Sequence, residues 1–126
     1  MSVGIITGAF WQRGKHMDRK TVESYILSFP NAKLTYPFGE DVAVYKVPVK
    51  GEDKMFALIP ENKTPLNVSL KCDPQLAEIL RDTYVSVMPG YHLNKKHWNT
   101  LVLGNELPWE EVQGLILHSY NLVVGE

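Results

Sequence analysis

Apolar residues recur along this chain at two periods, which separate predicted helices from predicted strands. Near the start, four apolar residues share one helical face at the spacing i, i+3, i+4 and i+7: Val22, Tyr25, Ile26 and Phe29. Asp18 precedes them and can cap a helix that runs from Arg19 to about Phe29, where Pro30 ends it.

Short segments rich in β-forming residues follow this helix. The predicted strands are residues 33–38, 42–49, 54–60 and 66–71, with a last strand at 100–103. Residues 66–71 alternate apolar and polar side chains at period two, which is typical of a half-buried strand. Short turns join the first four strands, so antiparallel hairpins are expected.

Two further helices are predicted from their start signals. Asp73-Pro74 combines a capping side chain with proline at the first helical position. The expected buried stripe of this helix is Leu76, Ile79, Leu80 and Thr83, bordered by Ala77, and a link at residues 84–88 follows it. Pro108 opens the final helix, whose apolar face is Val112, Leu115, Ile116, Tyr120 and Val123.

Helices kept apart from a run of hairpins predict an α+β two-layer sandwich, with an antiparallel sheet and helices on one face. The other face would meet solvent or a partner, and Tyr45, Met55 and Phe56 are candidates for it. Residues 17–126 are expected to form a single domain. Residues 1–16 hold three glycines without a periodic apolar pattern, so a flexible N-terminal extension is expected there.

Composition narrows the function classes. The chain has 126 residues, 44% of them hydrophobic and 21% charged, as in soluble globular domains. The formal net charge of -1 gives no general argument for nucleic acid or membrane binding, so such an argument must be local. Cys72 is the single cysteine, which excludes an internal disulfide and a cysteine-based zinc site and fits a reducing cytoplasm. With four scattered histidines, no metal and no cofactor are expected, and no apolar run reaches the roughly 18 residues of a membrane span.

One segment, residues 89–100, has an unusual density of functional groups. It reads Pro-Gly-Tyr-His-Leu-Asn-Lys-Lys-His-Trp-Asn-Thr, and no acidic residue occurs between Asp82 and Glu106. Its lysines can neutralise phosphates, its amides can donate hydrogen bonds, and its aromatic rings can stack on exposed bases. The candidate nucleic-acid-binding residues are therefore Lys95, Lys96, His97, Trp98, His92, Asn94 and Asn99, joined by Lys71 if its strand neighbours the last one.

This segment resembles the signature of the MmcQ/YjbR family. The strand at residues 66–71 with its Cys-Asp-Pro continuation, and Pro37-Phe38-Gly39 ahead of the next strand, are similar to the same family. The resemblance covers residues 17–123. It implies a small α+β fold like those of bacterial frataxin-like and secretion-chaperone-like proteins. It also implies a bacterial cytoplasmic location and DNA binding, which is ascribed to members by analogy of fold.

Three other interpretations stay open beside DNA binding. Trp98 and Asn99 could be core residues, with Asn94 and His97 satisfying backbone groups of an irregular loop. His92 or His97 could act as a general acid or base, although nucleophile and phosphate-loop motifs are absent, so no enzyme is expected. The open sheet face could bind another protein; a monomer is nevertheless expected.

The pattern before Asp18 generates a first prediction. Deletion of residues 1–16 should leave the thermal midpoint within about 4 °C of that of the full chain, because changes outside the core usually alter stability little. Differential scanning calorimetry of both chains measures this. Loss of a cooperative transition in the shorter chain would contradict it.

Overall fold

The computed structural model describes residues 17–90 and 92–126, so the predicted N-terminal extension (residues 1–16) and Tyr91 lie outside the described residues. Six antiparallel strands form a sheet in the order β1-β2-β3-β4-β6-β5. The strands are β1 (Lys33–Thr35), β2 (Val42–Val49), β3 (Glu52–Pro60), β4 (Asn67–Lys71), β5 (Val87–Pro89) and β6 (Trp98–Val102). The helices are α2 (Arg19–Leu27), α3 (Pro74–Thr83) and α4 (Trp109–Val124).

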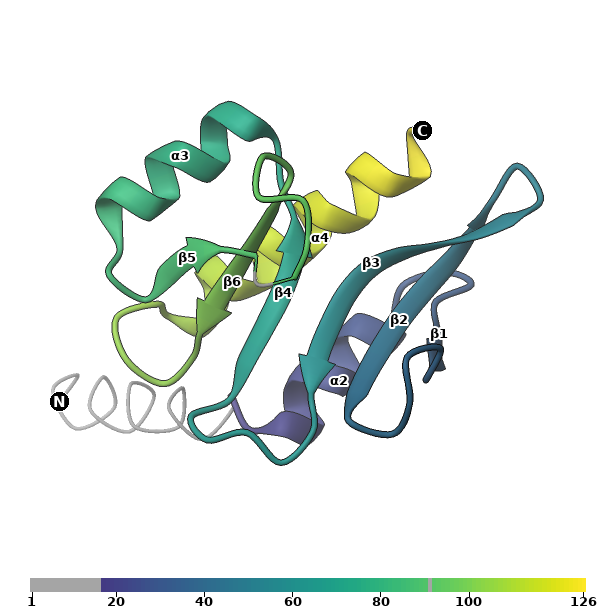
Figure 1. Cartoon of the computed structure of the whole chain (residues 1–126), viewed down its shortest axis with the longest axis horizontal. Helices are drawn as coiled ribbons and strands as arrows, with labels where there is room; N and C mark the ends of the chain where they lie inside the picture. The colour runs from purple at the N-terminus through teal and green to yellow at the C-terminus, as the bar shows by residue number, and fades with distance from the viewer. Residues whose placement is uncertain (1–16, 91) are drawn as a thin grey trace, which may run out of the picture.

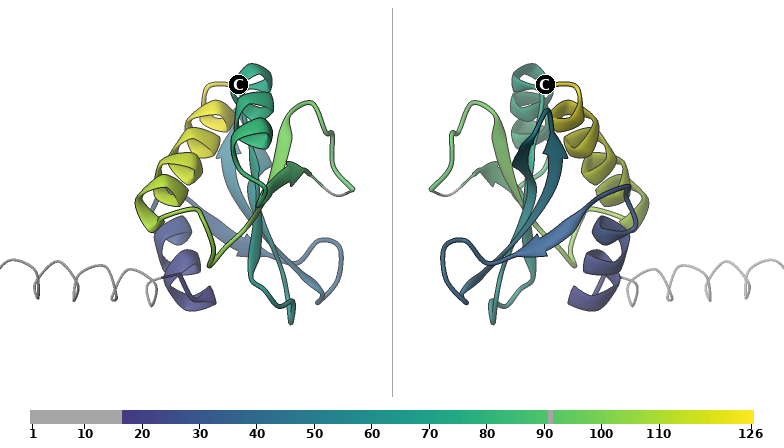
Figure 2. Two further views of the ribbon diagram at one scale, coloured as in Figure 1. Left: turned by 90° about the vertical axis from the view of Figure 1, so that its left-hand side faces the viewer. Right: turned by 90° about the vertical axis from the view of Figure 1, so that its right-hand side faces the viewer.

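The helices are distributed unequally around the sheet (Figures 1 and 2). α2 and α4 cover one face, and the main core lies between them and the sheet. α3 lies beside the end of the sheet formed by β5 and β6. The predicted α+β architecture is confirmed. None of the helices in the described part of the chain combines the length and apolar character needed to cross a membrane.

Side-chain caps set where the first two helices begin, as predicted. The Asp18 carboxylate accepts a hydrogen bond of 2.8 Å from the Thr21 amide. Asp73 accepts two bonds of 3.1 Å from the amides of Gln75 and Leu76, with Pro74 at the first helical position. These bonds satisfy amides that have no partner inside the helix.

The predicted buried stripe of α3 is wrong in part. Ala77 and Leu80 are buried, but Ile79 is 60% exposed and Thr83 is also exposed. The helix is turned so that Arg81, rather than Ile79, points toward the sheet end. The predicted link at residues 84–88 also contains most of β5, a three-residue strand that was too short for a periodic signal.

A bulge in β3 changes which residues face the helices. The pairing of β2 with β3 shifts register between Tyr45 and Lys46, which leaves Phe56 without a paired residue. Phe56 and Ala57 therefore both enter the main core beside Tyr45. Met55 instead joins a second apolar cluster (Val44, Leu58 and Trp98, with Val42 and Leu93) on the opposite face. Of the three predicted open-face residues, Met55 is placed correctly, whereas Tyr45 and Phe56 are core residues.

A buried hydroxyl on α4 bonds the bulge to the neighbouring strand. Ser119 is fully buried, and its Oγ donates a hydrogen bond of 2.6 Å to the Phe56 carbonyl. The same Oγ accepts a bond of 2.9 Å from the Lys71 amide. One side chain thus satisfies two backbone groups that lie beside the helix and connects α4 to both β3 and β4.

A network of polar side chains connects α2 to the sheet on the face that α2 and α4 cover. Arg19 forms a two-pronged ion pair with Glu61, which also accepts a hydrogen bond of 2.8 Å from the Tyr36 hydroxyl. The hydrogen bond from Arg19 lowers the pKa of the Glu61 carboxyl below its usual range. The Tyr45 hydroxyl donates to Glu23 at 2.5 Å, and burial raises the pKa of Tyr45. The network joins α2, β2 and the β3–β4 connection.

β5 forms one edge of the sheet, and its amides are already occupied. The bonds that flank the strand join the Val102 amide to the Ser86 carbonyl and the Gly90 amide to the Trp98 carbonyl. The backbone groups of Val87 and Pro89 therefore point away from β6, whereas the Val87 side chain lies in the main core. The Val87 amide donates to the Tyr84 carbonyl at 3.1 Å, and proline has no amide hydrogen. Across these three residues the edge presents carbonyl acceptors without a free amide donor.

The Ser119 bridge generates a second prediction. Ser119→Ala should lower the free energy of unfolding by about 1–3 kcal/mol, because it leaves a buried amide and a buried carbonyl unpaired. Ser24→Ala on the exposed side of α2 is the matched control, since it removes the same hydroxyl from a helix. The control should stay within about 0.5 kcal/mol of wild type. Equal effects of the two changes in urea denaturation would contradict the assigned role of Ser119.

Candidate functional site

The functional groups predicted from the sequence lie on the connection between β5 and β6. Its central part, residues 92–97, is called the basic loop here. The basic loop projects from the face of the sheet opposite α2 and α4 (Figure 2). Leu93 folds back onto the second apolar cluster, where it packs with Val44, Leu58 and Trp98. The basic loop therefore covers part of the face that the sequence left open.

Two predicted contact residues are buried in β6, next to this loop in the sequence. Trp98 is 7% exposed in the second apolar cluster, so its indole is not available to stack on a base. Asn99 is 2% exposed and points to the opposite face, where its amide donates to the Ala77 carbonyl at 3.3 Å. Successive side chains of a strand point to opposite faces, so Trp98 and Asn99 lie on opposite sides of the sheet. The structure therefore corrects the predicted role of both side chains.

Arg81 on α3 holds the loop in place. Its Nε donates to the Asn99 side-chain oxygen at 2.7 Å. One terminal nitrogen of the guanidinium donates to the Lys95 carbonyl and, at 3.3 Å, to the Trp98 carbonyl. The planar arrangement of donors in arginine suits this simultaneous contact with a side chain and two carbonyls. Both ends of the segment 95–98 are thereby fixed to α3.

Further contacts fix the loop at its base. The Asn94 side-chain oxygen accepts a hydrogen bond of 3.0 Å from the Lys96 amide. The Asn94 backbone carbonyl accepts bonds from the amides of His97 and Trp98. Asn94 therefore shapes the turn, as one interpretation of the sequence proposed. The Gly90 amide donates to the Trp98 carbonyl at 2.8 Å. A Cβ atom on Gly90 would lie 2.7 Å from Trp98 Cβ, so the close approach requires glycine.

Five predicted residues of the basic loop remain at least partly accessible. His92, Asn94, Lys95 and Lys96 are exposed, and His97 is partly exposed. Neither lysine ammonium forms an ion pair within the described residues. His92 has a left-handed backbone with φ of 61°, a conformation that is uncommon for residues other than glycine. These side chains are the parts of the predicted site that can meet a partner.

Lys71 lies on β4, which pairs with β6, so the condition for including it in the site is met; its ammonium is nevertheless engaged elsewhere. Its ammonium forms an ion pair with Glu126, a carboxylate that Lys54 also approaches at 3.2 Å. The hydrogen bond from Lys71 lowers the pKa of the Glu126 carboxyl. The positive charge of Lys71 is thus locally compensated, and the site loses one predicted cation.

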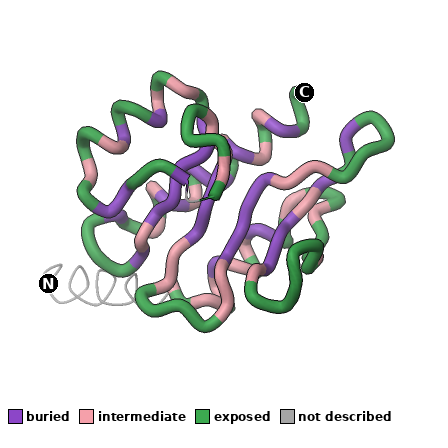
Figure 3. The backbone as a smooth tube through the Cα atoms, in the orientation of Figure 1, coloured by how far each residue is buried: buried purple, intermediate pink, exposed green. Residues whose placement is uncertain are grey.

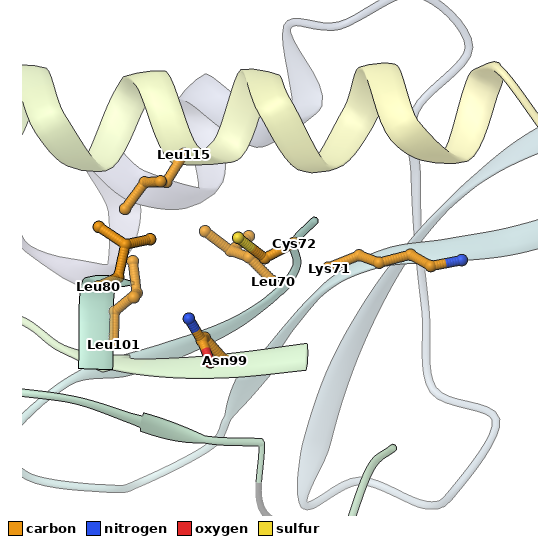
Figure 4. Close-up of a pocket in the computed structure, with 7 residues that line it drawn as sticks. All are labelled: Leu70, Lys71, Cys72, Leu80, Asn99, Leu101 and Leu115. Atoms are coloured by element: carbon orange, nitrogen blue, oxygen red, sulfur yellow. The ribbon is translucent and has the colours of Figure 1, made fainter. Parts of the chain in front are cut away.

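A small cavity of about 10 Å³ lies under Asn99 (Figure 4). Mostly apolar residues line it: Leu70, Lys71, Cys72, Leu80, Asn99, Leu101 and Leu115. This volume is at the lower limit for one water molecule, so the cavity is a packing defect without room for a ligand. Burial raises the pKa of the Cys72 thiol to about 11, which keeps it a neutral core residue. Buried positions, drawn in purple, run along the central strands of the sheet (Figure 3).

The described residues do not form a set of ligands for a metal ion. Within residues 17–90 and 92–126, no three His, Cys, Asp or Glu side chains gather in an arrangement that could hold a metal ion. His118 on α4 accepts a hydrogen bond of 3.1 Å from the Asp73 amide through Nε2. The imidazole therefore helps to cap α3.

Arg81 is the residue of the candidate site that sequence reasoning missed. Its helical position was visible, but a lone arginine on a helix is normally solvent-exposed. A weak signal was available: Arg81 lies one turn after Ala77 and next to Leu80, on the side of α3 that is buried. A helix that places arginine on its buried side predicts a buried acceptor on the neighbouring element, here Asn99.

These features describe a two-layer α+β domain in which a basic loop covers part of one face of an antiparallel sheet. The model of the YjbR family matches residues 27–122, and the chain belongs to this family. The resemblance found in the sequence is thereby confirmed.

Several proteins of known sequence or structure are similar to this chain. YbdF of Escherichia coli O157:H7 is 36% identical over 105 residues, which cover 83% of each chain. YjbR of Escherichia coli K12 is 42% identical over 76 residues, 60% of this chain and 64% of its own. Both are described as uncharacterized proteins.

Two solved structures share the fold. The crystal structure of Deinococcus radiodurans protein DR2400, a DUF419 domain, has a TM-score of 0.80 and 38% identity, and covers 85% of this chain and 78% of its own. A crystal structure from Pseudomonas syringae has a TM-score of 0.70 and 30% identity, and covers 84% of this chain and 98% of its own.

The close approach of Gly90 to Trp98 generates a third prediction. Gly90→Ala should destabilise the protein by about 1–3 kcal/mol, because the methyl group must displace the β6 backbone or the indole. Gly114→Ala on α4 is the control, since nothing lies within 4 Å of the added Cβ atom. The control should stabilise by about 0.5–1 kcal/mol, as alanine favours the helix. Opposite signs in thermal denaturation support the assignment, and a neutral Gly90→Ala variant would contradict it.

Proposed function

We propose that this protein is a binding module for an anionic partner, with DNA as the partner and the exposed edge of the basic loop as the contact surface. The observation that carries the proposal is a pair of adjacent, exposed lysines on a backbone held from both sides. The Lys95 carbonyl is bonded to Arg81, and the Lys96 amide is bonded to the Asn94 side chain. Lysine ammonium groups bind phosphate as compact point charges.

Preorganisation of the loop supports this use of the lysines. Binding to a flexible loop loses free energy when the loop becomes ordered, and a loop already held by its own protein avoids that loss. Phosphates recur about every 3.4 Å of helix axis along one DNA strand, so neighbouring lysines can engage successive phosphates. His92 and His97 flank the pair and add hydrogen-bond donors to the same edge.

The burial of Trp98 and Asn99 narrows the mode of binding. Trp98 cannot stack on unpaired bases, and Asn99 cannot read base edges. The remaining groups are suited to phosphate contacts, which position a protein on DNA and carry no sequence information directly. The proposal is therefore duplex binding with little sequence preference, and with a small number of phosphate contacts.

The salt dependence of binding generates a fourth prediction. Each phosphate contact on a duplex contributes about 0.9 to the slope of log affinity against log salt concentration. The double variant Lys95→Ala/Lys96→Ala should flatten this slope by roughly two units and weaken binding equally for unrelated sequences. Fluorescence anisotropy with two unrelated labelled duplexes, across a salt series, measures both effects.

A control variant with the same change in net charge tests whether the surface is local. Lys20→Ala/Lys63→Ala removes two exposed lysines from α2 and from the β3–β4 connection. This control should retain the wild-type slope. An equal loss of slope in both double variants would indicate unspecific attraction to the whole surface. Absence of wild-type binding at about 20 mM salt, where the counterion term is strong, would remove the DNA proposal.

A further inference from the structure

A groove lies at the end of the sheet, at the edge strand β5 and the turn that follows β6. Its volume is about 410 Å³, within the range of roughly 300–1,000 Å³ that small-molecule sites occupy. Three apolar and three polar residues line it: Val85, Met88, Val102, Ser86, Asn105 and Glu106. Val85 is 92% exposed and Met88 is 42% exposed, so the apolar wall is accessible.

The groove contains a polar group whose hydrogen bonding is incomplete. Ser86 is 7% exposed, and its Oγ is itself buried and has no hydrogen-bond partner among the described residues. The backbone of Ser86 is fully used, because its amide donates to Glu106 Oε2 at 2.6 Å and its carbonyl accepts from the Val102 amide at 2.8 Å. A buried hydroxyl without a partner is uncommon in folded proteins and calls for an explanation such as an unfilled site.

The chemistry of the lining selects one kind of ligand. Ser86, Asn105 and Glu106 each offer an oxygen that can accept a hydrogen bond, and no Lys, Arg or His among the described residues lines the groove. A primary ammonium group carries three donors and a positive charge. An anionic ligand would instead lie beside the Glu106 carboxylate without a compensating cation. The polar side of the groove therefore fits a cation.

We propose that this groove binds a small aliphatic primary amine. The ammonium group donates to the Glu106 carboxylate, to Ser86 Oγ and to the Asn105 side-chain oxygen. The aliphatic chain lies against Val85, Met88 and Val102. Met88 is unbranched and exposed, so its side chain can move to admit the amine to the serine hydroxyl. This site is separate from the basic loop and takes a ligand of the opposite charge, so it does not depend on the DNA proposal.

Nuclear magnetic resonance titration with three matched probes tests the proposal. n-Hexylamine, 1-hexanol and hexanoate share an apolar chain and differ in the charge of the head group. Hexylamine should shift the Met88 methyl and Ser86 amide resonances along a saturating curve, and should bind about tenfold more tightly than hexanol, as expected for a hydrogen bond to a charged group. Hexanoate should bind more weakly than either.

Variants assign the contacts. Glu106→Gln removes the charge but keeps an oxygen for the Ser86 amide, and it should reduce the affinity for hexylamine about tenfold while leaving that for hexanol unchanged. Ser86→Ala should also weaken hexylamine binding. Glu40→Gln, an exposed change in the β1–β2 connection, is the matched control and should have no effect. Absence of a saturating shift with hexylamine, or equal affinities for the three probes, would overturn the proposal.

Discussion

The arrangement of the candidate site depends on one side chain, Arg81. Its guanidinium donates to the buried Asn99 side chain on β6, to the Lys95 carbonyl of the basic loop and to the Trp98 carbonyl at the start of β6. It therefore joins α3 to the part of the chain richest in functional groups. Without it the Asn99 side-chain oxygen would lack this partner inside the protein. The basic loop would then be held by Leu93, by the bond of 2.7 Å from the Cys72 amide to the His97 carbonyl, and by bonds within its own turn. The position of Lys95 and Lys96 is therefore set from a helix that neither lysine belongs to.

The two faces of the sheet are built in different ways. On the helix side, the bulge at Phe56 places two consecutive side chains in the main core, and the Ser119 hydroxyl satisfies the carbonyl that the bulge leaves beside α4. On the opposite side, a smaller apolar cluster is covered by the basic loop through Leu93. The core thus fixes the sheet, and the sheet in turn provides the floor on which the loop rests. The candidate site lies on the face opposite α2 and α4. Its position depends on the main core, because that core fixes the sheet.

Local signals predicted much of this fold. Asp18, Asp73 and Pro74 mark helix starts through chemistry that acts within three residues, so the sequence alone was sufficient. The strand at residues 67–71 was recognised by its alternation. Three features depended on contacts distant in the sequence and were not predicted. They are the rotation of α3 that exposes Ile79, the bulge that turns Phe56 inward, and the strand β5, which has three residues and ends in proline.

The sequence identified the segment that carries the accessible functional groups. The roles predicted for some of its side chains were wrong. Residue types showed that His92, Lys95 and Lys96 could meet a partner, and the structure leaves them exposed. They could not show that Trp98 and Asn99 belong to a strand while their neighbours belong to a loop. Lys71 was expected near the same surface, but its partner Glu126 lies at the far end of the chain, beyond the reach of any local pattern.

The edge strand β5 has a consequence for how copies of this protein meet. A sheet grows by matching the amides of one edge with the carbonyls of the next, and long exposed edges are the usual starting points of fibrous assembly. At β5 the Val87 amide is already bonded within its own chain, and Pro89 has none. Two such edges brought together would set carbonyl against carbonyl. The backbone of β5 therefore disfavours edge-to-edge polymerisation at this end of the sheet. Side chains at this edge can then line the neighbouring groove without a need to block pairing.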